Sequence, residues 1–146
     1  MSRAKRNFMN WSLAEGEENG KPLYIRFRDE YREKGADSAF PRLIQIVWKY
    51  ESDEQGLPTM EVIPALKEFE NLLIEAVEPE KIAVLVAVCT NNGEREWMLY
   101  AKGVSEFRER LNTLESEEEE PFPIDITSAP DPKWTALFDD TLGGLS

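Results

Sequence analysis

Residues 82–101 carry the feature that most constrains the fold: two β-prone runs separated by a short polar turn. The first run is Ile82–Thr90 and the second is Arg95–Ala101. Asn92 and Gly93 lie between them, and this pair suits the two positive φ angles of a type I′ turn, whose twist matches that of paired strands. The sequence therefore predicts a β-hairpin in this region.

The segments around this hairpin have the periodicities of helices and strands. In two of them apolar residues recur three and four positions apart, as on one face of an amphipathic helix. Others alternate between apolar and polar residues, which is typical of strands. The expected order is strand 41–51, helix 63–77, strand 81–90, strand 94–101, helix 104–115 and strand 122–127.

This order is that of the split βαβ motif, so we expect an α+β fold in which two helices cover one face of a two-layer, ferredoxin-like antiparallel sheet. Alternation over residues 8–15 and 23–28 predicts an N-terminal β-hairpin that extends the sheet. Asp131 and Pro132 have the residue types of a helix cap and a first helical position, and they predict a short C-terminal helix.

The second face of this sheet also needs a cover, because strand 81–90 is apolar on both sides. Several exposed side chains of this kind would forfeit several kcal/mol at about 25 cal/mol per Å², which is comparable to the net stability of a domain. The N-terminal hairpin, the C-terminal segment or a second subunit could provide the cover. We favour the C-terminal segment, because Trp134, Leu137 and Phe138 form an apolar face at helical spacing.

Length and composition limit the classes of function. A chain of 146 residues has the size of one domain, and we expect it to cover residues 8–142, with flexible ends at 1–7 and 143–146. The net charge of −12 argues against binding nucleic acid, because phosphate contacts need clustered Lys and Arg. The chain has no histidine and one cysteine, Cys89, so we expect no zinc site and no cofactor. No segment has the length of a membrane span or the pattern of a signal peptide, and we expect a cytoplasmic protein.

Three segments are distinctive: an aromatic opening strand around Trp11, the turn Thr90–Glu96 with Tyr100 closing its strand, and Asp131-Pro132-Lys133-Trp134 near the end. Together they resemble a family of bacterial proteins that is grouped as domain of unknown function 695. The resemblance spans most of the chain. It implies no established activity and carries over no catalytic residue.

One cationic and aromatic grouping is a candidate ligand site in this acidic chain. If their strands are neighbours, outward side chains could line a shallow site for a carboxylate, a phosphate or an acidic protein segment, with Arg26 and Arg95 as bidentate donors. The alternative is that these side chains pair with the abundant glutamates as ordinary cross-strand contacts. The candidate residues are Tyr24, Arg26, Lys49, Arg95 and Tyr100, with Arg28 and Gln45 beside them.

The carboxylates do not form a catalytic or metal-binding pattern. Glu94 and Glu96 project to the same face of their strand, and Arg95 projects to the other. The run Glu117–Glu120 lacks the preorganised geometry that holds calcium. We therefore expect no catalytic residue and no metal site.

These observations lead us to expect a non-enzymatic module that binds a protein partner, as a regulator or as the acidic inhibitor of a basic protein. Homo-oligomers are compatible with the sequence. Two alternatives stay open: a small enzyme that uses Arg and Glu on an open sheet face, and a sensor of small anions.

Overall fold

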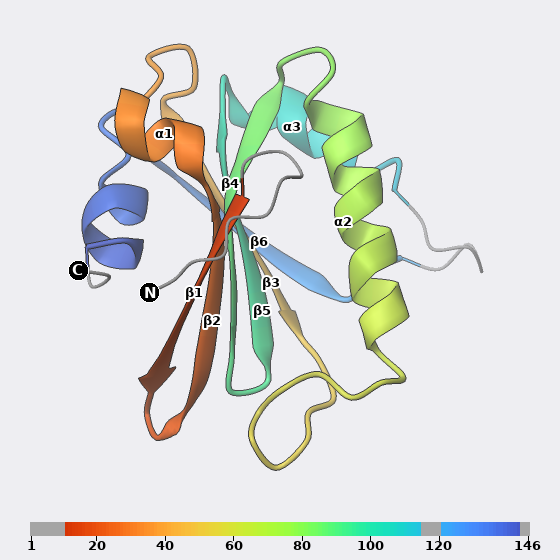
Figure 1. The fold of residues 1–146 in the computed structure, drawn as a ribbon. Coiled ribbons are helices and arrows are strands. Elements are labelled where there is room, and N and C mark those ends of the chain that lie inside the picture. Colours follow the sequence, from red (N-terminus) through yellow and green to blue (C-terminus); the bar gives the residue numbers. More distant parts are fainter. Residues whose placement is uncertain (1–10, 115–120, 144–146) are drawn as a thin grey trace.

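The computed structural model describes residues 11–114 and 121–143, and it has a six-stranded antiparallel sheet as its centre (Figure 1). The strand order across the sheet is β1-β2-β4-β5-β3-β6. The mixed architecture confirms the α+β class. The strands are β1 (Trp11–Glu18), β2 (Lys21–Arg28), β3 (Arg42–Lys49), β4 (Ala83–Asn91), β5 (Glu94–Ala101) and β6 (Ile124–Pro130). The helical segments are α1 (Asp29–Lys34), α2 (Ile63–Val77), α3 (Val104–Leu111) and the π-helical η1 (Ala136–Thr141).

Two tight turns set the register of the hairpins. Asn92 and Gly93 join β4 to β5 with φ angles of 47° and 86°, which confirms the predicted turn with two positive φ values. Asn19 and Gly20 join β1 to β2 in the same way, with φ angles of 56° and 77°. Both strands reach closer to the turn than the predicted ranges 8–15 and 23–28, because the turn takes only these two residues; residues 8–10 lie outside the described part of the chain.

Helices α2 and α3 lie on one face of the sheet, as the apolar periodicity predicts (Figure 1). Leu66, Phe69, Leu73 and Val77 of α2 are all fully buried in the core cluster between the helices and the strands. Pro64 occupies the first turn of α2. Backbone N–H groups there have no acceptor within the helix, so the N–H that proline lacks breaks no helical hydrogen bond. Helix α2 therefore begins at the predicted residue.

The opposite face of the sheet is covered by α1 and the C-terminal segment, on the other side of the sheet from α2 (Figure 1). Trp134 and Leu137 are buried there, and Phe138 packs against them. The indole of Trp134 stacks on Tyr100 with ring centroids 4.3 Å apart, and its Nε1 donates to Phe40 O at 2.9 Å. The prediction that the C-terminal segment covers this face is confirmed.

The end of the chain differs in detail from the expected helix. Asp131 Oδ1 accepts the backbone N–H of Thr135, and Asp131 Oδ2 accepts that of Ala136. Trp134 has a φ angle of 58°, so the chain turns before η1 begins at Ala136, and Pro132 is not in the helix. The predicted cap at Asp131 and first helical position at Pro132 are therefore wrong: the N-cap is Thr135, and Asp131 instead accepts backbone N–H groups at the start of the helical segment.

Some sequence predictions lie outside the described residues. They are the flexible end at 1–7, most of the end at 143–146, and the acidic run Glu117–Glu120. In the described part of the chain, no helix has both the length and the apolar character needed to cross a bilayer.

Candidate functional site

An open cavity of about 450 Å³ lies on the face of the sheet that carries α2, between the N-terminal hairpin, the central hairpin and the loop before α2. Its volume is within the range of small-ligand sites, about 300–1,000 Å³. Two arginines supply the charge of its walls, which are otherwise mainly apolar, and none of the carboxylates in the described part of the chain lines it. The lining residues are Leu13, Tyr24, Arg26, Leu57, Pro58, Ile63, Val88, Thr90 and Arg95.

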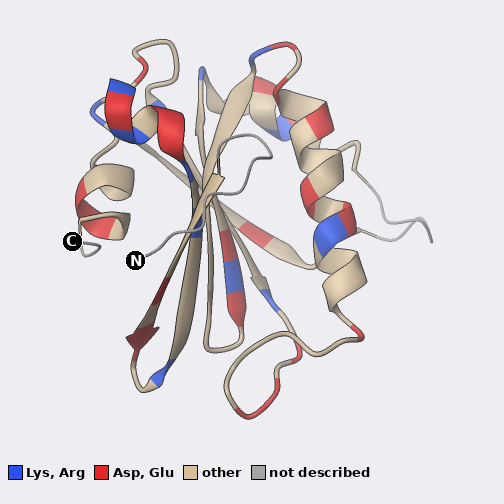
Figure 2. Cartoon of the chain, in the orientation of Figure 1, with Lys and Arg blue, Asp and Glu red and all other residues tan. Residues whose placement is uncertain are grey.

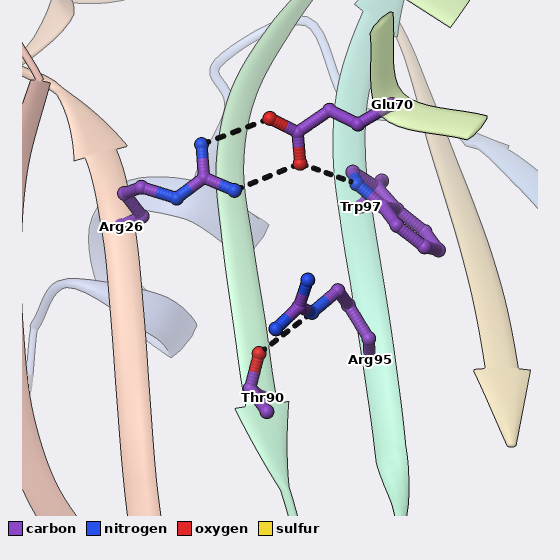
Figure 3. Close-up of polar contacts among 5 residues, drawn as sticks. All are labelled: Arg26, Glu70, Thr90, Arg95 and Trp97. Carbon is purple, nitrogen blue, oxygen red and sulfur yellow. Dashed lines mark hydrogen bonds and ion pairs between the residues drawn. The ribbon is translucent and has the colours of Figure 1, made fainter. Parts of the chain in front are cut away.

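Arg26 is held in place by a carboxylate of the helix above it. Its Nη1 donates to Glu70 Oε2 at 3.0 Å, and its Nη2 donates to Glu70 Oε1 at 2.8 Å (Figure 3). The indole Nε1 of Trp97 also donates to Glu70 Oε1, at 2.9 Å. The guanidinium of Arg26 lies over the ring of Trp11, 5.2 Å from its centroid. These contacts fix the side chain that forms one wall of the cavity.

The charge state of Glu70 follows from these contacts. Burial alone would raise its pKa, but the hydrogen bonds and charge of Arg26 lower it, with smaller contributions from Trp97 and the charge of Arg95. The net result is a pKa below the usual value for glutamate. Glu70 is therefore ionised at neutral pH, and both its oxygens are occupied by donors.

Arg95 of β5 lies beside the Arg26–Glu70 ion pair and has fewer hydrogen-bond partners than Arg26. Its Nε donates to Thr90 Oγ1 at 2.9 Å (Figure 3), and this is its one hydrogen bond among residues 11–114 and 121–143. None of the ion pairs within that part of the chain includes Arg95. Burial lowers the pKa of its guanidinium and the positive charge of Arg26 lowers it further, while the negative charge of Glu70 offsets part of this. A half-buried cation is thus left without an ion pair within residues 11–114 and 121–143.

The polar groups at this site carry a net charge of +1. Arg26 and Arg95 are both cationic, and Glu70 supplies one negative charge, which Arg26 engages with both of its Nη atoms. Like charges in a partly desolvated site repel each other, and an anion in the cavity would relieve this repulsion. The arrangement is therefore suited to binding an anion.

The apolar wall of the cavity depends on a loop that is fixed to the central hairpin. Tyr50 Oη donates to Gly56 O at 2.6 Å, and Gly93 N donates to the same oxygen at 2.8 Å. Gly56 has a φ of 83°, and a Cβ atom there would lie 2.6 Å from the Cα of Asn92. This close approach places the next two residues, Leu57 and Pro58, against the cavity.

The structure brings three of the five predicted site residues together: Tyr24, Arg26 and Arg95 all line the cavity. It separates the other two. Tyr100 is fully buried on the opposite face, where its Oη donates to Asp131 Oδ2 at 2.7 Å. Lys49 is exposed at the end of β3, next to Trp48, whose ring belongs to the core on the α2 side.

Strand geometry explains this correction. Arg95 and Tyr100 are five residues apart on one strand, and an odd separation directs two side chains to opposite faces of a sheet. Burial and then the hydrogen bond and charge of Asp131 raise the pKa of Tyr100, so its hydroxyl stays protonated at neutral pH. The grouping of all five residues into one site was therefore wrong for Tyr100 and Lys49.

The two remaining neighbours also have other roles. Arg28 pairs with Glu78 at 2.9 Å, and Glu78 Oε2 accepts the backbone N–H of Leu85 at 3.0 Å, beside the bulge in β4. Gln45 Nε2 donates to Glu96 Oε2 at 3.0 Å. This is an ordinary cross-strand contact with a glutamate, which was the alternative to a ligand site for these side chains.

Sequence reasoning missed Glu70, Trp97 and Thr90, which position the two arginines. Glu70 follows Phe69 on α2, at the border of the apolar face. No local pattern shows that this position lies over β2, 44 residues earlier in the chain. One of these contacts could have been found in the sequence. The predicted hairpin register places Thr90 opposite Arg95.

A second cavity, of about 320 Å³, lies on the opposite face beside η1. Four carboxylates line it: Glu18, Glu94, Glu96 and Asp140. Cys89 also lines it, and burial, with the charges of Glu96 and Glu18, raises the pKa of this thiol to about 12. In the described ranges, no three cysteine or carboxylate side chains are grouped as ligands for a metal ion. Figure 2 shows alternating acidic and basic residues on β5. Glu94 and Glu96 line the second cavity, whereas Arg95 lines the first.

Comparison with known proteins gives one match. No curated protein and no solved structure matches the chain. The sequence model of a family of unknown function, DUF695, matches residues 9–142. The chain therefore belongs to the family of unknown function DUF695, as the resemblance in its sequence predicted.

Proposed function

We propose that this protein is a non-enzymatic binding module and that the cavity lined by Arg26 and Arg95 binds an anionic ligand. The observation that carries the proposal is the half-buried guanidinium of Arg95, which has no ion-pair partner in the described part of the chain and lies beside a second arginine. The protein as a whole has a charge of −12, so a cavity that two arginines line without any carboxylate from residues 11–114 and 121–143 is a local exception.

The contacts of Glu70 favour binding over catalysis. A general acid or base needs a pKa near the working pH and a free position toward the substrate. Glu70 has a lowered pKa, its oxygens accept from Arg26 and Trp97, and it is not among the residues that line the cavity. Its role is to hold Arg26, so the small enzyme is the weaker alternative.

Nuclear magnetic resonance of the tryptophan indole groups tests the proposal. The Nε1–H of Trp97 is bonded to Glu70 beside the cavity, whereas that of Trp134 is bonded to Phe40 O across the sheet. We expect sodium octanoate, sodium acetate or sodium phosphate, added at constant ionic strength, to shift the Trp97 signal along a saturable curve and leave Trp134 unchanged.

The matched variants are Arg95→Gln and Arg108→Gln, which remove the same charge inside and outside the cavity. Arg108 is exposed on α3. The anion response should disappear in Arg95→Gln and persist in Arg108→Gln. A wild-type protein that shows no saturable response to any of the three anions, or an Arg95→Gln variant that responds like the wild type, would refute the proposal.

A basic protein partner is the second candidate, and it is supported by the acidic cavity beside η1. Glu18 and Glu94 are exposed at this cavity, whereas Glu61 and Glu75 are exposed elsewhere. This candidate would be supported if the wild type and Glu61→Gln/Glu75→Gln both capture a basic protein. The double variant Glu18→Gln/Glu94→Gln should then fail to capture it. Capture that is equal for both double variants would argue against it.

A cytoplasmic location stays a prediction.

We also propose the finer fold class, a ferredoxin-like sheet extended by the N-terminal hairpin. The order β4-β5-β3-β6 supports it, as does the placement of α2 and α3 on one face. Cross-strand nuclear Overhauser effects between β3 and its two neighbours, β5 and β6, would test this pairing directly.

A further inference from the structure

We infer that the ligand of the Arg95 cavity is a small amphipathic monocarboxylate, whose carboxylate binds Arg95 and whose aliphatic or aromatic body lies on the apolar wall. This inference rests on the proposed function and makes it specific. It follows from three properties of the site: the N–H groups of Arg95 that Thr90 does not use, the net charge of the site, and the apolar composition of the cavity walls.

The donors of Arg95 favour a carboxylate. A guanidinium presents five N–H groups in a planar fork, and the Nε–H of Arg95 is used by Thr90. The Nη atoms remain, and their parallel N–H groups match the two oxygens of a carboxylate. Thr90 therefore acts as a positioning residue, because it fixes the plane of the fork.

The charge of the site favours one negative charge on the ligand. Two arginines and Glu70 together carry +1, because Glu70 is ionised. A monocarboxylate would neutralise the site, whereas a phosphate dianion would leave an excess negative charge in a partly desolvated place. The half-buried position of Arg95 makes this difference larger than it would be at an exposed arginine.

The walls favour an apolar body. Leu13 and Ile63 are 42% and 40% exposed, and they are two of the three large apolar side chains that are well exposed among the described residues. Both line the cavity, together with Leu57, Pro58 and Val88. These side chains come from β1, the loop before α2, the start of α2 and β4. Apolar groups from four separate segments thus converge beside a guanidinium that forms no ion pair with any described residue.

A homologous series of carboxylates measures the contribution of the apolar wall. Dissociation constants of acetate, butyrate, hexanoate and octanoate are obtained from the Trp97 indole shift at constant ionic strength. Each buried methylene should tighten binding about fourfold until the wall is fully covered. Octanamide has the same body without the charge, and it should bind at least tenfold more weakly than octanoate. Hexyl phosphate should bind more weakly than hexanoate at a pH where the phosphate is a dianion.

The apolar wall has a matched pair of variants. Ile63→Ser removes an exposed side chain that lines the cavity, and Met60→Ser removes one that is 85% exposed and does not line it. Ile63→Ser should weaken octanoate binding by about tenfold and leave acetate binding nearly unchanged. Met60→Ser should bind both as the wild type does. Neither residue is buried, so both variants should fold.

The outcomes separate this inference from the proposed function. If acetate, octanoate and phosphate all shift Trp97 and Arg95→Gln abolishes the shifts, but affinity does not rise with chain length, the anion site stands and the amphipathic ligand is wrong. The amphipathic monocarboxylate is also wrong if hexyl phosphate binds more tightly than hexanoate. If no anion shifts Trp97, both proposals fail.

Discussion

Arg26 of β2 and Glu70 of α2 form a bidentate ion pair, with nitrogen–oxygen distances of 3.0 and 2.8 Å between residues 44 positions apart. The pair joins the N-terminal hairpin to the long helix. It also places one of two neighbouring guanidinium groups at the edge of the cavity. The same contact thus contributes to the fold and to the candidate site, and its two roles can be separated by experiment.

Glu70→Gln should destabilise the protein in a pH-dependent way. The folded-state pKa of Glu70 is below its usual value, so its stabilisation is present above the unfolded-state pKa and is lost as the pH falls through the folded-state pKa. At about pH 7 we expect a loss of about 1–2 kcal/mol in the free energy of unfolding, because charge-assisted hydrogen bonds are removed. Urea unfolding at intervals from about pH 7 to about pH 3 measures this.

The control for this variant is Glu75→Gln, an exposed position on the same helix. Its unfolding curve should stay close to that of the wild type. The difference between wild type and Glu70→Gln should shrink at the acid end of the range. A constant difference across the whole pH range would show that the ionised carboxylate of Glu70 is not the stabilising form.

Gly56→Ala should destabilise the protein and weaken anion binding together. A Cβ atom at this position meets the backbone of Asn92 at 2.6 Å, and the φ of 83° is strained for alanine. We expect a loss of about 1–3 kcal/mol in thermal or urea unfolding. Octanoate binding should also weaken, because Leu57 and Pro58 follow this residue. Gly16→Ala is the control, since a Cβ there has nothing within 4 Å.

Substitutions at Trp134 should test the cover of the second face. Trp134→Ala removes a fully buried indole that stacks on Tyr100, and large-to-small changes of this kind cost about 3–5 kcal/mol. Tyr100→Phe removes only the hydrogen bond to Asp131 and should cost about 1 kcal/mol. Urea unfolding distinguishes the two. If Trp134→Ala is as stable as the wild type, the C-terminal segment does not protect the sheet.

Cys89 should be unreactive in the folded protein. Its pKa is raised to about 12, by burial and then by the charges of Glu96 and Glu18, so the thiolate is a very minor species at about pH 8. A disulfide reagent added at about pH 8 should therefore react roughly a thousandfold more slowly than with the urea-unfolded chain. Equal rates would show that burial and the charge of Glu96, its cross-strand partner, do not suppress ionisation of the thiol.

Local signals in the sequence accounted for much of the fold. The pair Asn92 and Gly93 predicted the turn, and the positive φ of both residues is a property of these residue types. The apolar spacing over α2 predicted its bounds, because 3.6 residues per turn brings Leu66, Phe69 and Leu73 to one side. Alternation placed Tyr24 and Arg26 on one face of β2, and the structure keeps them together at the cavity.

The candidate site required the tertiary structure. Arg26, Glu70 and Arg95 come from three separate elements, and no periodicity relates one element to another. The pairing of β2 with β4, and the position of α2 above them, bring these charges together.

By itself, the sequence determined helix α2 and the strands of the central hairpin, because backbone propensity and side-chain period act over a few neighbouring residues. It also determined that the central strand needs cover on both faces, since that follows from its composition. Only the tertiary structure decided that Arg26 pairs with Glu70 and that Arg95 has no ion pair within the described part of the chain. Ion pairing falls off over a few ångströms, and distances between separate elements are set by the packing of the whole sheet and its helices.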